Sequence, residues 1–169
     1  MHLFYLFSVW LHILAAAVWV GGMVFFGVVL VPVIRRPENQ GVAASLVQLT
    51  GLRFRLAGWL SLAILFLTGF FNLFYRAFAW ADLWSGRLWE GAFGRALALK
   101  LFLFVLVLLL SCLHDFAIGP RAAELWRTDP TSPQAGRLRR QASWIGRLNI
   151  LLALLIVALG IMLVRGWPW

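Results

Sequence analysis

Four polar side chains lie inside long apolar runs of the sequence, where they are the groups best placed to do chemistry. They are His12, Thr68, Asn72 and Lys100. An imidazole binds heme iron or copper, and a lysine amine in an apolar site can act as a second ligand or as an acid/base group. We therefore expect a cofactor site centred on His12, the metal ligand, with Lys100, Thr68 and Asn72 around it.

The composition decides which class of fold must position these groups. Of the 169 residues, 63% are hydrophobic and 12% are charged, whereas soluble domains average about 45–50% apolar and about 25% charged. A soluble fold of this size has too little interior to bury so much apolar surface. A water-soluble enzyme, an immunoglobulin-type module and a disordered tail are therefore excluded. We expect an all-α integral membrane protein, with residues 1–169 forming a single membrane domain.

Four uncharged runs predict four membrane-spanning helices, because a bilayer core of about 30 Å takes about 20 helical residues. We place these helices at about 3–33, 56–76, 96–118 and 148–165. The charge-free part of the third, residues 101–114, is too short to span alone. Lys100, or His114 with Asp115, or both, must therefore enter the membrane.

The basic residues predict the orientation of this four-helix bundle. Ten of them lie in the segments 35–55 and 121–147, and five lie on the other side of the bundle. By the positive-inside rule, both termini face the outer, periplasmic side of a bacterial cytoplasmic (inner) membrane. The net charge of +9 thus reflects a lipid bilayer as partner and not a nucleic acid.

The segments at the cytoplasmic side carry the prolines that we expect to break the helices there. These are Pro37, Pro120, Pro130 and Pro133. A short echo also links the exits of the first and third helices: Pro32, Arg35 and Glu38 against Pro120, Arg121 and Glu124. The echo alone is too weak to establish an internal repeat.

Depth along the helices, at about 1.5 Å per residue, sorts the polar groups into two layers. The outer layer holds His12, Thr68, Asn72 and Lys100. The inner layer holds His114, Asp115, Arg147 and Asn149. His12 and His114 then differ in depth by about 12 Å, so the two histidines are not expected to share one iron.

The helix face that carries His12 is rich in small residues, and Trp19 lies on it two turns further on. Small residues let helices approach closely, and they also leave room for a flat macrocycle, with Trp19 in the cofactor set. A structural alternative exists for each candidate. His12 can be a hydrogen-bonded structural residue, Lys100 can reach up to the interface, and His114 with Asp115 can be an inner-interface polar pair.

The string Leu11-His12-Ile13-Leu14-Ala15-Ala16-Ala17-Val18-Trp19-Val20-Gly21-Gly22 resembles the first helix of the CopD-type copper-resistance membrane domain. Thr68-Gly69, Gly94-Arg95 and Lys100-Leu101 resemble later parts of that domain. The order of His12 and Lys100 is also similar to HemJ, the membrane protoporphyrinogen oxidase, and that likeness implies heme b held by these two residues. Pro32 and Arg35-Arg36 depart from the HemJ pattern and fit the CopD-like one better.

Our main functional expectation is a heme b-binding membrane protein with a redox or heme-handling role. If the chain is an enzyme, it is then a heme-dependent oxidoreductase, because no GxSxG, P-loop or HExxH motif is present. The alternatives are copper handling or transport across the membrane, a HemJ-like oxidase, and a cofactor-free assembly partner of a respiratory complex. The implied partners are a porphyrin or copper, and a respiratory-chain protein or a copper chaperone.

Overall fold

The computed structural model describes residues 2–75, 79–129 and 131–165, and within them every long element is a helix. The first rod runs through α1 (His2–Val24), the π-helix η1 (Phe25–Leu30) and α2 (Val31–Ile34). The second is α3 (Gln40–Tyr75). The third runs through α5 (Gly91–Cys112), the π-helix η4 (Leu113–Ile118) and α6 (Gly119–Thr128), and the fourth is α7 (Pro133–Arg165).

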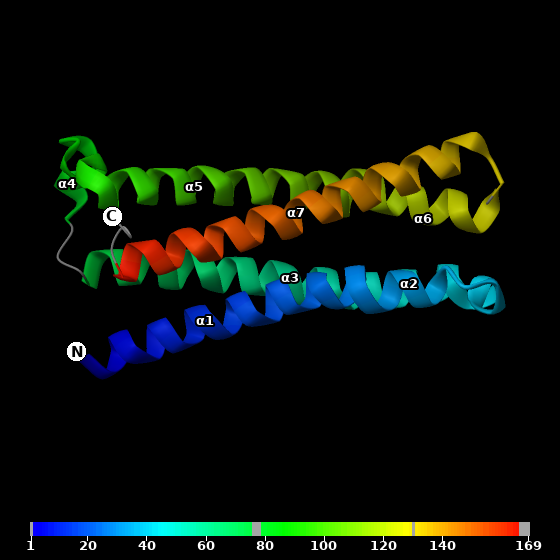
Figure 1. Ribbon diagram of the computed structural model, residues 1–169, viewed down its shortest axis with the longest axis horizontal. Coiled ribbons are helices and arrows are strands. Elements are labelled where there is room, and N and C mark those ends of the chain that lie inside the picture. Colours follow the sequence, from blue (N-terminus) through cyan, green and yellow to red (C-terminus); the bar gives the residue numbers. More distant parts are fainter. Residues whose placement is uncertain (1, 76–78, 130, 166–169) are drawn as a thin grey trace.

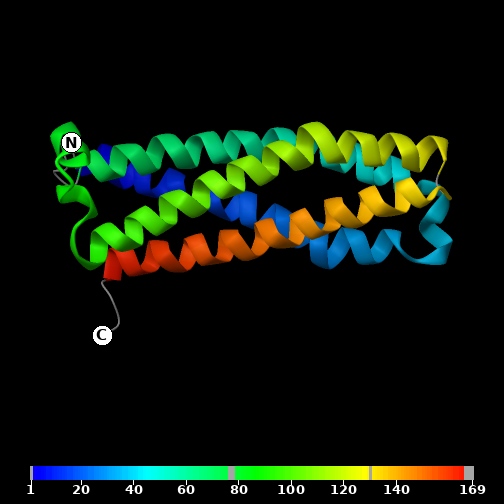
Figure 2. The same cartoon turned by 90° about the horizontal axis from the view of Figure 1, so that it is seen from above.

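Each of the four rods is long and apolar enough to cross a membrane, which confirms the expected all-α bundle. The first and second rods form one hairpin, in which α1 packs against α3. The third and fourth rods form another, in which α5 packs against α7. Helix α1 begins and α7 ends at the end of the bundle that also holds α4 (Trp80–Trp84) and η3 (Arg87–Trp89) (Figure 1). We call this the terminal end, and we call the opposite end, where α6 turns into α7, the arginine-rich end (Figures 1 and 2).

The helices extend further than the spans drawn from the sequence. Helix α3 begins at Gln40, α7 begins at Pro133, and the third rod continues to Thr128. Arginines such as Arg53 and Arg139 end the apolar run at these places, but they are good helix formers and do not end the helix. Only short turns, one of them containing η2 (Pro37–Asn39), remain at the arginine-rich end.

The prolines act differently from one another. Pro37 opens η2 and Pro133 opens α7, as expected of helix boundaries, whereas Pro130 lies outside the described residues. The expectation for Pro120 was wrong, because it lies inside the third rod, in the first turn of α6. A proline inside a continuous rod leaves one carbonyl of the preceding turn without its N–H donor, and a side chain of α3 supplies that donor.

The two long hairpins contain the same order of elements, which strengthens the similarity between their sequences noted above. Each has a six-residue π-helix, η1 or η4, followed by one residue and then Pro32 or Pro120. In both, the residue before the proline donates its N–H to the carbonyl five positions back, from Val31 to Phe26 and from Gly119 to His114. His12 and Lys100 each precede the first residue of their π-helix by thirteen positions, so the two side chains occupy equivalent places.

The core is narrow, and large and small apolar residues from all four rods contribute to it. Trp19, Met23, Leu62, Val107 and Ala153 form the buried cluster at mid-height. Many other large apolar side chains are exposed on the outside of the bundle, as expected of surface that faces lipid.

Candidate functional site

The strongest polar contact between separate rods joins the His12 ring to α3. His12 Nδ1 lies 2.7 Å from Thr68 Oγ1, which in turn donates to the Ile64 carbonyl at 2.6 Å. A hydroxyl has one proton, and a carbonyl oxygen can only accept. With the Thr68 proton on Ile64, the His12 Nδ1–H must donate to Thr68. This tautomer leaves the lone pair of Nε2 free, and Nε2 makes no hydrogen bond with any residue that the structure describes.

The antiparallel register of α1 and α3 places more polar groups next to this pair. One turn from His12 and Thr68 toward the terminal end lie Ser8 on α1 and Asn72 on α3. A further turn out, the Tyr5 ring stacks on a tyrosine of α3 with 4.3 Å between centroids. Ser8 Oγ and Asn72 Oδ1 are both buried, and neither has a hydrogen-bond partner among the described residues. The interface therefore holds two unsatisfied oxygens beside the imidazole, which is costly unless something binds them.

Lys100 reaches the same level from α5. Its amine points toward α7, where a Cβ added at Gly160 would lie 3.4 Å from Nζ. The amine is also close enough to the His12 ring for an electrostatic interaction between them. No described carboxylate lies within 4 Å of Lys100. The structure thus brings all four sequence-selected residues, His12, Thr68, Asn72 and Lys100, to the terminal half of the bundle.

Two glycines make the space that these side chains occupy. A Cβ added at Gly69 would lie 3.4 Å from His12 Cε1, and the Gly160 position is equally close to Lys100. Ser8 and Gly160 were not selected from the sequence. Ser8 sits at i−4 from His12 and was noted there only as a small residue; Gly160 carries no signal that distinguishes it from the other glycines.

The groove that the structure describes at this level is small for a heme macrocycle. The groove described between α1 and α3 has a volume of about 290 Å³, at the lower limit of the roughly 300–1,000 Å³ of pockets for drug-sized ligands. It is lined by mainly apolar residues: Phe4, Phe7, Ser8, Leu11, Leu67, Thr68 and Phe71. His12 does not line it, so an iron in this groove would not be beside the free Nε2. The heme expectation therefore finds no support in the geometry.

Trp19 belongs to a different environment from the rest of the expected cofactor set. It is only 6% exposed and packs with Met23 and Leu62 in the apolar core. Its separation of seven positions from His12 amounts to about 10 Å along α1. Trp19 therefore supports the packing below the site and does not contact the polar groups.

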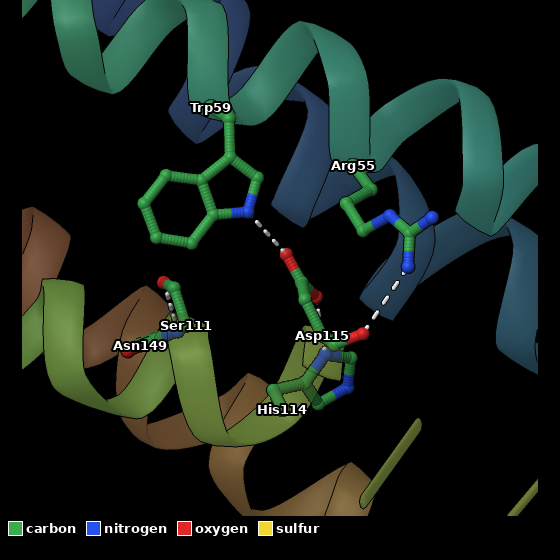
Figure 3. A network of polar contacts seen from close by, with 6 residues as sticks. All are labelled: Arg55, Trp59, Ser111, His114, Asp115 and Asn149. Carbon is green, nitrogen blue, oxygen red and sulfur yellow. Dashed lines mark hydrogen bonds and ion pairs between the residues drawn. The ribbon is translucent and has the colours of Figure 1, made fainter. Parts of the chain in front are cut away.

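A second polar cluster surrounds Asp115 nearer to the arginine-rich end (Figure 3). One carboxylate oxygen accepts the Trp59 indole N–H at 3.0 Å, and the other lies 2.8 Å from His114 Nδ1. Trp59 and Thr68 are nine residues apart on α3, which separates the two clusters by about 14 Å. Arg147, which we expected in this layer, instead lies over the ring of Trp144 at 5.6 Å.

Arg55 explains how the rod continues through Pro120. In the π register, residue 120 would donate to the Asp115 carbonyl, but proline has no N–H. The Arg55 guanidinium donates to that carbonyl instead, at 3.2 Å (Figure 3). Arg55 and Trp59 were not selected from the sequence, because neither is unusual in type or depth until the rotation of α3 is known.

Asn149 and Ser111 form a buried bridge between α7 and α5, with Asn149 Nδ2 donating to Ser111 Oγ at 3.1 Å (Figure 3).

The sulfur side chains, which are the soft metal ligands, lie away from both polar clusters. Cys112 is exposed and Met23 lies in the core. Across the described residues, no three His, Cys, Asp or Glu side chains gather as a metal site. His12 and His114 are thus isolated imidazoles, each oriented through Nδ1.

Comparison with known proteins gives one family match. The model of the family CopD, described as Copper resistance protein D, matches residues 49–163. This range begins within α3 and includes Thr68, Lys100 and Asp115, while His12 precedes it. An uncharacterized protein of Aquifex aeolicus (strain VF5) is 33% identical over 159 residues, which cover 93% of this chain and 93% of that protein. No solved structure matches the chain.

Proposed function

Because this chain belongs to the copper resistance protein D (CopD) family, we propose that it handles copper within the membrane, with His12 Nε2 as a ligand. Copper is the cargo in this proposal, and the expected alternative of copper handling replaces heme b as the main interpretation. The multi-pass character follows from four apolar rods. We further propose that the membrane is the bacterial cytoplasmic one and that the terminal end faces outward.

The observation that carries the proposal is the hydrogen bond from His12 to Thr68 at 2.7 Å. Metal-ligating histidines commonly donate one ring N–H to a neighbouring acceptor, which fixes the tautomer and the direction of the other nitrogen. Thr68 performs that task from α3. Imidazole nitrogen is a suitable ligand for copper.

The other groups of the site give the ion its surroundings. Asn72 Oδ1 and Ser8 Oγ are buried acceptors that have no partner in the part of the chain that the structure describes, and each can approach a cation one turn from His12. Lys100 provides a second nitrogen donor or an acid/base group from the opposite hairpin. Since His12 and Lys100 occupy equivalent places in the two hairpins, we place the ion between the hairpins.

The test is the copper content of detergent-purified protein and its Cu(I) affinity, measured by competition with a colorimetric chelator. We expect one copper per chain, and we expect His12→Ala to lose it. His114→Ala is the matched control, because it removes another intramembrane imidazole and should leave copper at the terminal half unchanged.

An absorption spectrum of the same sample separates the alternatives. A Soret band that depends on His12 would overturn the copper proposal in favour of heme b or a HemJ-like oxidase. A colourless protein that binds no copper and purifies with respiratory-complex subunits would favour the assembly-partner alternative. Association with a copper chaperone would instead support copper handling.

A further inference from the structure

A groove of about 540 Å³ lies at the arginine-rich end, between Ile118 at the end of η4 and the first half of α7. The surface of the groove is almost entirely apolar, so its arginines face it with their aliphatic stems and not with their guanidinium groups. The residues that line it are Ile118, Trp144, Ile145, Arg137, Arg140 and Gln141. None of them takes part in the copper proposal. We propose that this groove binds an acidic phospholipid, with the phosphate on the two arginines and the first part of the acyl chains on the apolar residues.

The charge of the groove is not neutralised by the protein. Arg137 and Arg140 are exposed and lie one turn apart on α7. Among the described side chains, neither has a carboxylate within 4 Å, although Glu124 and Asp129 belong to the adjoining segment. A pair of guanidinium groups with free N–H donors matches the oxygens of a phosphate group.

Two neighbouring arginines on α7 lie over tryptophan rings, which distinguishes them from the groove pair. Arg139 lies over the Trp126 ring at 5.2 Å, and Arg147 lies over the Trp144 ring at 5.6 Å. The groove arginines have no such aromatic partner in the part of the chain that the structure describes.

The depth of the groove matches the headgroup layer. Arg147 and Arg165 bracket an uncharged stretch of α7 whose eighteen-residue separation measures about 27 Å, close to a hydrocarbon core of about 30 Å. Trp144 next to Arg147 is then at the interface, where tryptophan is enriched. Arg140 and Arg137 lie two to three turns further along α7, about 10 and 15 Å beyond Arg147, so they meet a phosphate group at the outer edge of the headgroup layer. Ile118 and Ile145 face the start of the acyl chains.

An acidic headgroup suits the groove better than a zwitterionic one. A phosphatidylcholine headgroup brings its own ammonium beside the two guanidinium groups, whereas phosphatidylglycerol adds only negative charge. Basic clusters next to membrane helices attract acidic lipids for this reason.

The experiment measures the apparent melting temperature of the delipidated full chain in detergent, with phosphatidylglycerol, phosphatidylcholine or inorganic phosphate added. We expect phosphatidylglycerol to raise it by several degrees and the other two to change it little. Arg137→Gln with Arg140→Gln should abolish the rise. The matched control is Arg35→Gln with Arg36→Gln, which removes the same charge at the same end, outside the groove, and should keep the rise.

A second variant covers the case in which the double substitution does not fold. Ile118→Trp keeps the charge but fills the groove, and we expect it to lose the phosphatidylglycerol effect too. An equal rise with inorganic phosphate would assign the site to a free anion and overturn the lipid. An equal rise in all variants would show that phosphatidylglycerol acts through the general charge of this end, which would also overturn the proposal.

Discussion

The imidazole of His12 and the hydroxyl of Thr68 are locked into one arrangement by a third atom. Because Thr68 Oγ1 lies 2.6 Å from the Ile64 carbonyl, its proton is used there, and His12 Nδ1–H donates to Thr68 across 2.7 Å. The helix backbone of α3 thereby determines which nitrogen of a ring on α1 keeps its lone pair. A hydroxyl at position 68 is needed for this effect.

Thr68→Val should weaken Cu(I) binding by about 10–100-fold, the usual loss when a group that orients a ligand is removed. Valine keeps the shape of threonine but cannot accept the Nδ1–H. Thr68→Ser retains the hydroxyl and should bind within a few-fold of the unmodified protein. Chelator competition measures both. Equal affinity in the valine variant would show that Thr68 does not orient the ligand.

Lys100 can be tested through its equivalence to His12. If its amine is a donor to copper, Lys100→Leu and Lys100→Arg should both weaken binding by at least about tenfold, or 1.4 kcal/mol, because neither leucine nor a guanidinium group has a lone pair to offer. Lys100→His should restore binding, since it puts a second imidazole at the equivalent place. Tighter binding by the leucine variant would show that Lys100 repels the ion instead.

Depth could be predicted from the sequence, but rotation about the helix axes could not. Counting residues placed His12, Thr68, Asn72 and Lys100 at one level, because antiparallel helices convert sequence position directly into height. The partners of Asp115 depend on which face of α3 turns inward. The polar residues of the span-forming part of α3, Ser61, Thr68 and Asn72, share one face, and Trp59 lies on the opposite face, so no polar stripe indicates that its indole turns inward. Because the rotation of α1 was equally unknown, Trp19 was included in the expected cofactor set, although it packs in the core.

Gly94 is the glycine whose substitution should be most damaging to the fold. A Cβ at Gly94 would overlap the backbone carbonyl group of Trp89, which cannot rotate away as a side chain can. Gly94→Ala should lower the apparent melting temperature by about 5–10 °C, as expected of about 2–3 kcal/mol of overpacking. Gly21→Ala is the control, because nothing lies within 4 Å of its Cβ position. It should be neutral or slightly stabilising. The melting temperatures of both variants are measured in detergent by circular dichroism. Equal melting temperatures would contradict the close approach of Gly94 to the Trp89 backbone.

The bond between Trp59 and Asp115 should contribute to stability independently of any cargo. Trp59→Phe keeps the aromatic packing but removes the N–H that reaches the carboxylate at 3.0 Å, which should cost about 1–3 kcal/mol. Trp84→Phe is the matched control, because Trp84 is 88% exposed, and it should change little. Once Asp115→Ala has removed the acceptor, adding Trp59→Phe should cost less than it does alone, with about 1 kcal/mol of coupling. Strictly additive effects in this cycle would mean that the two side chains do not interact in the folded protein.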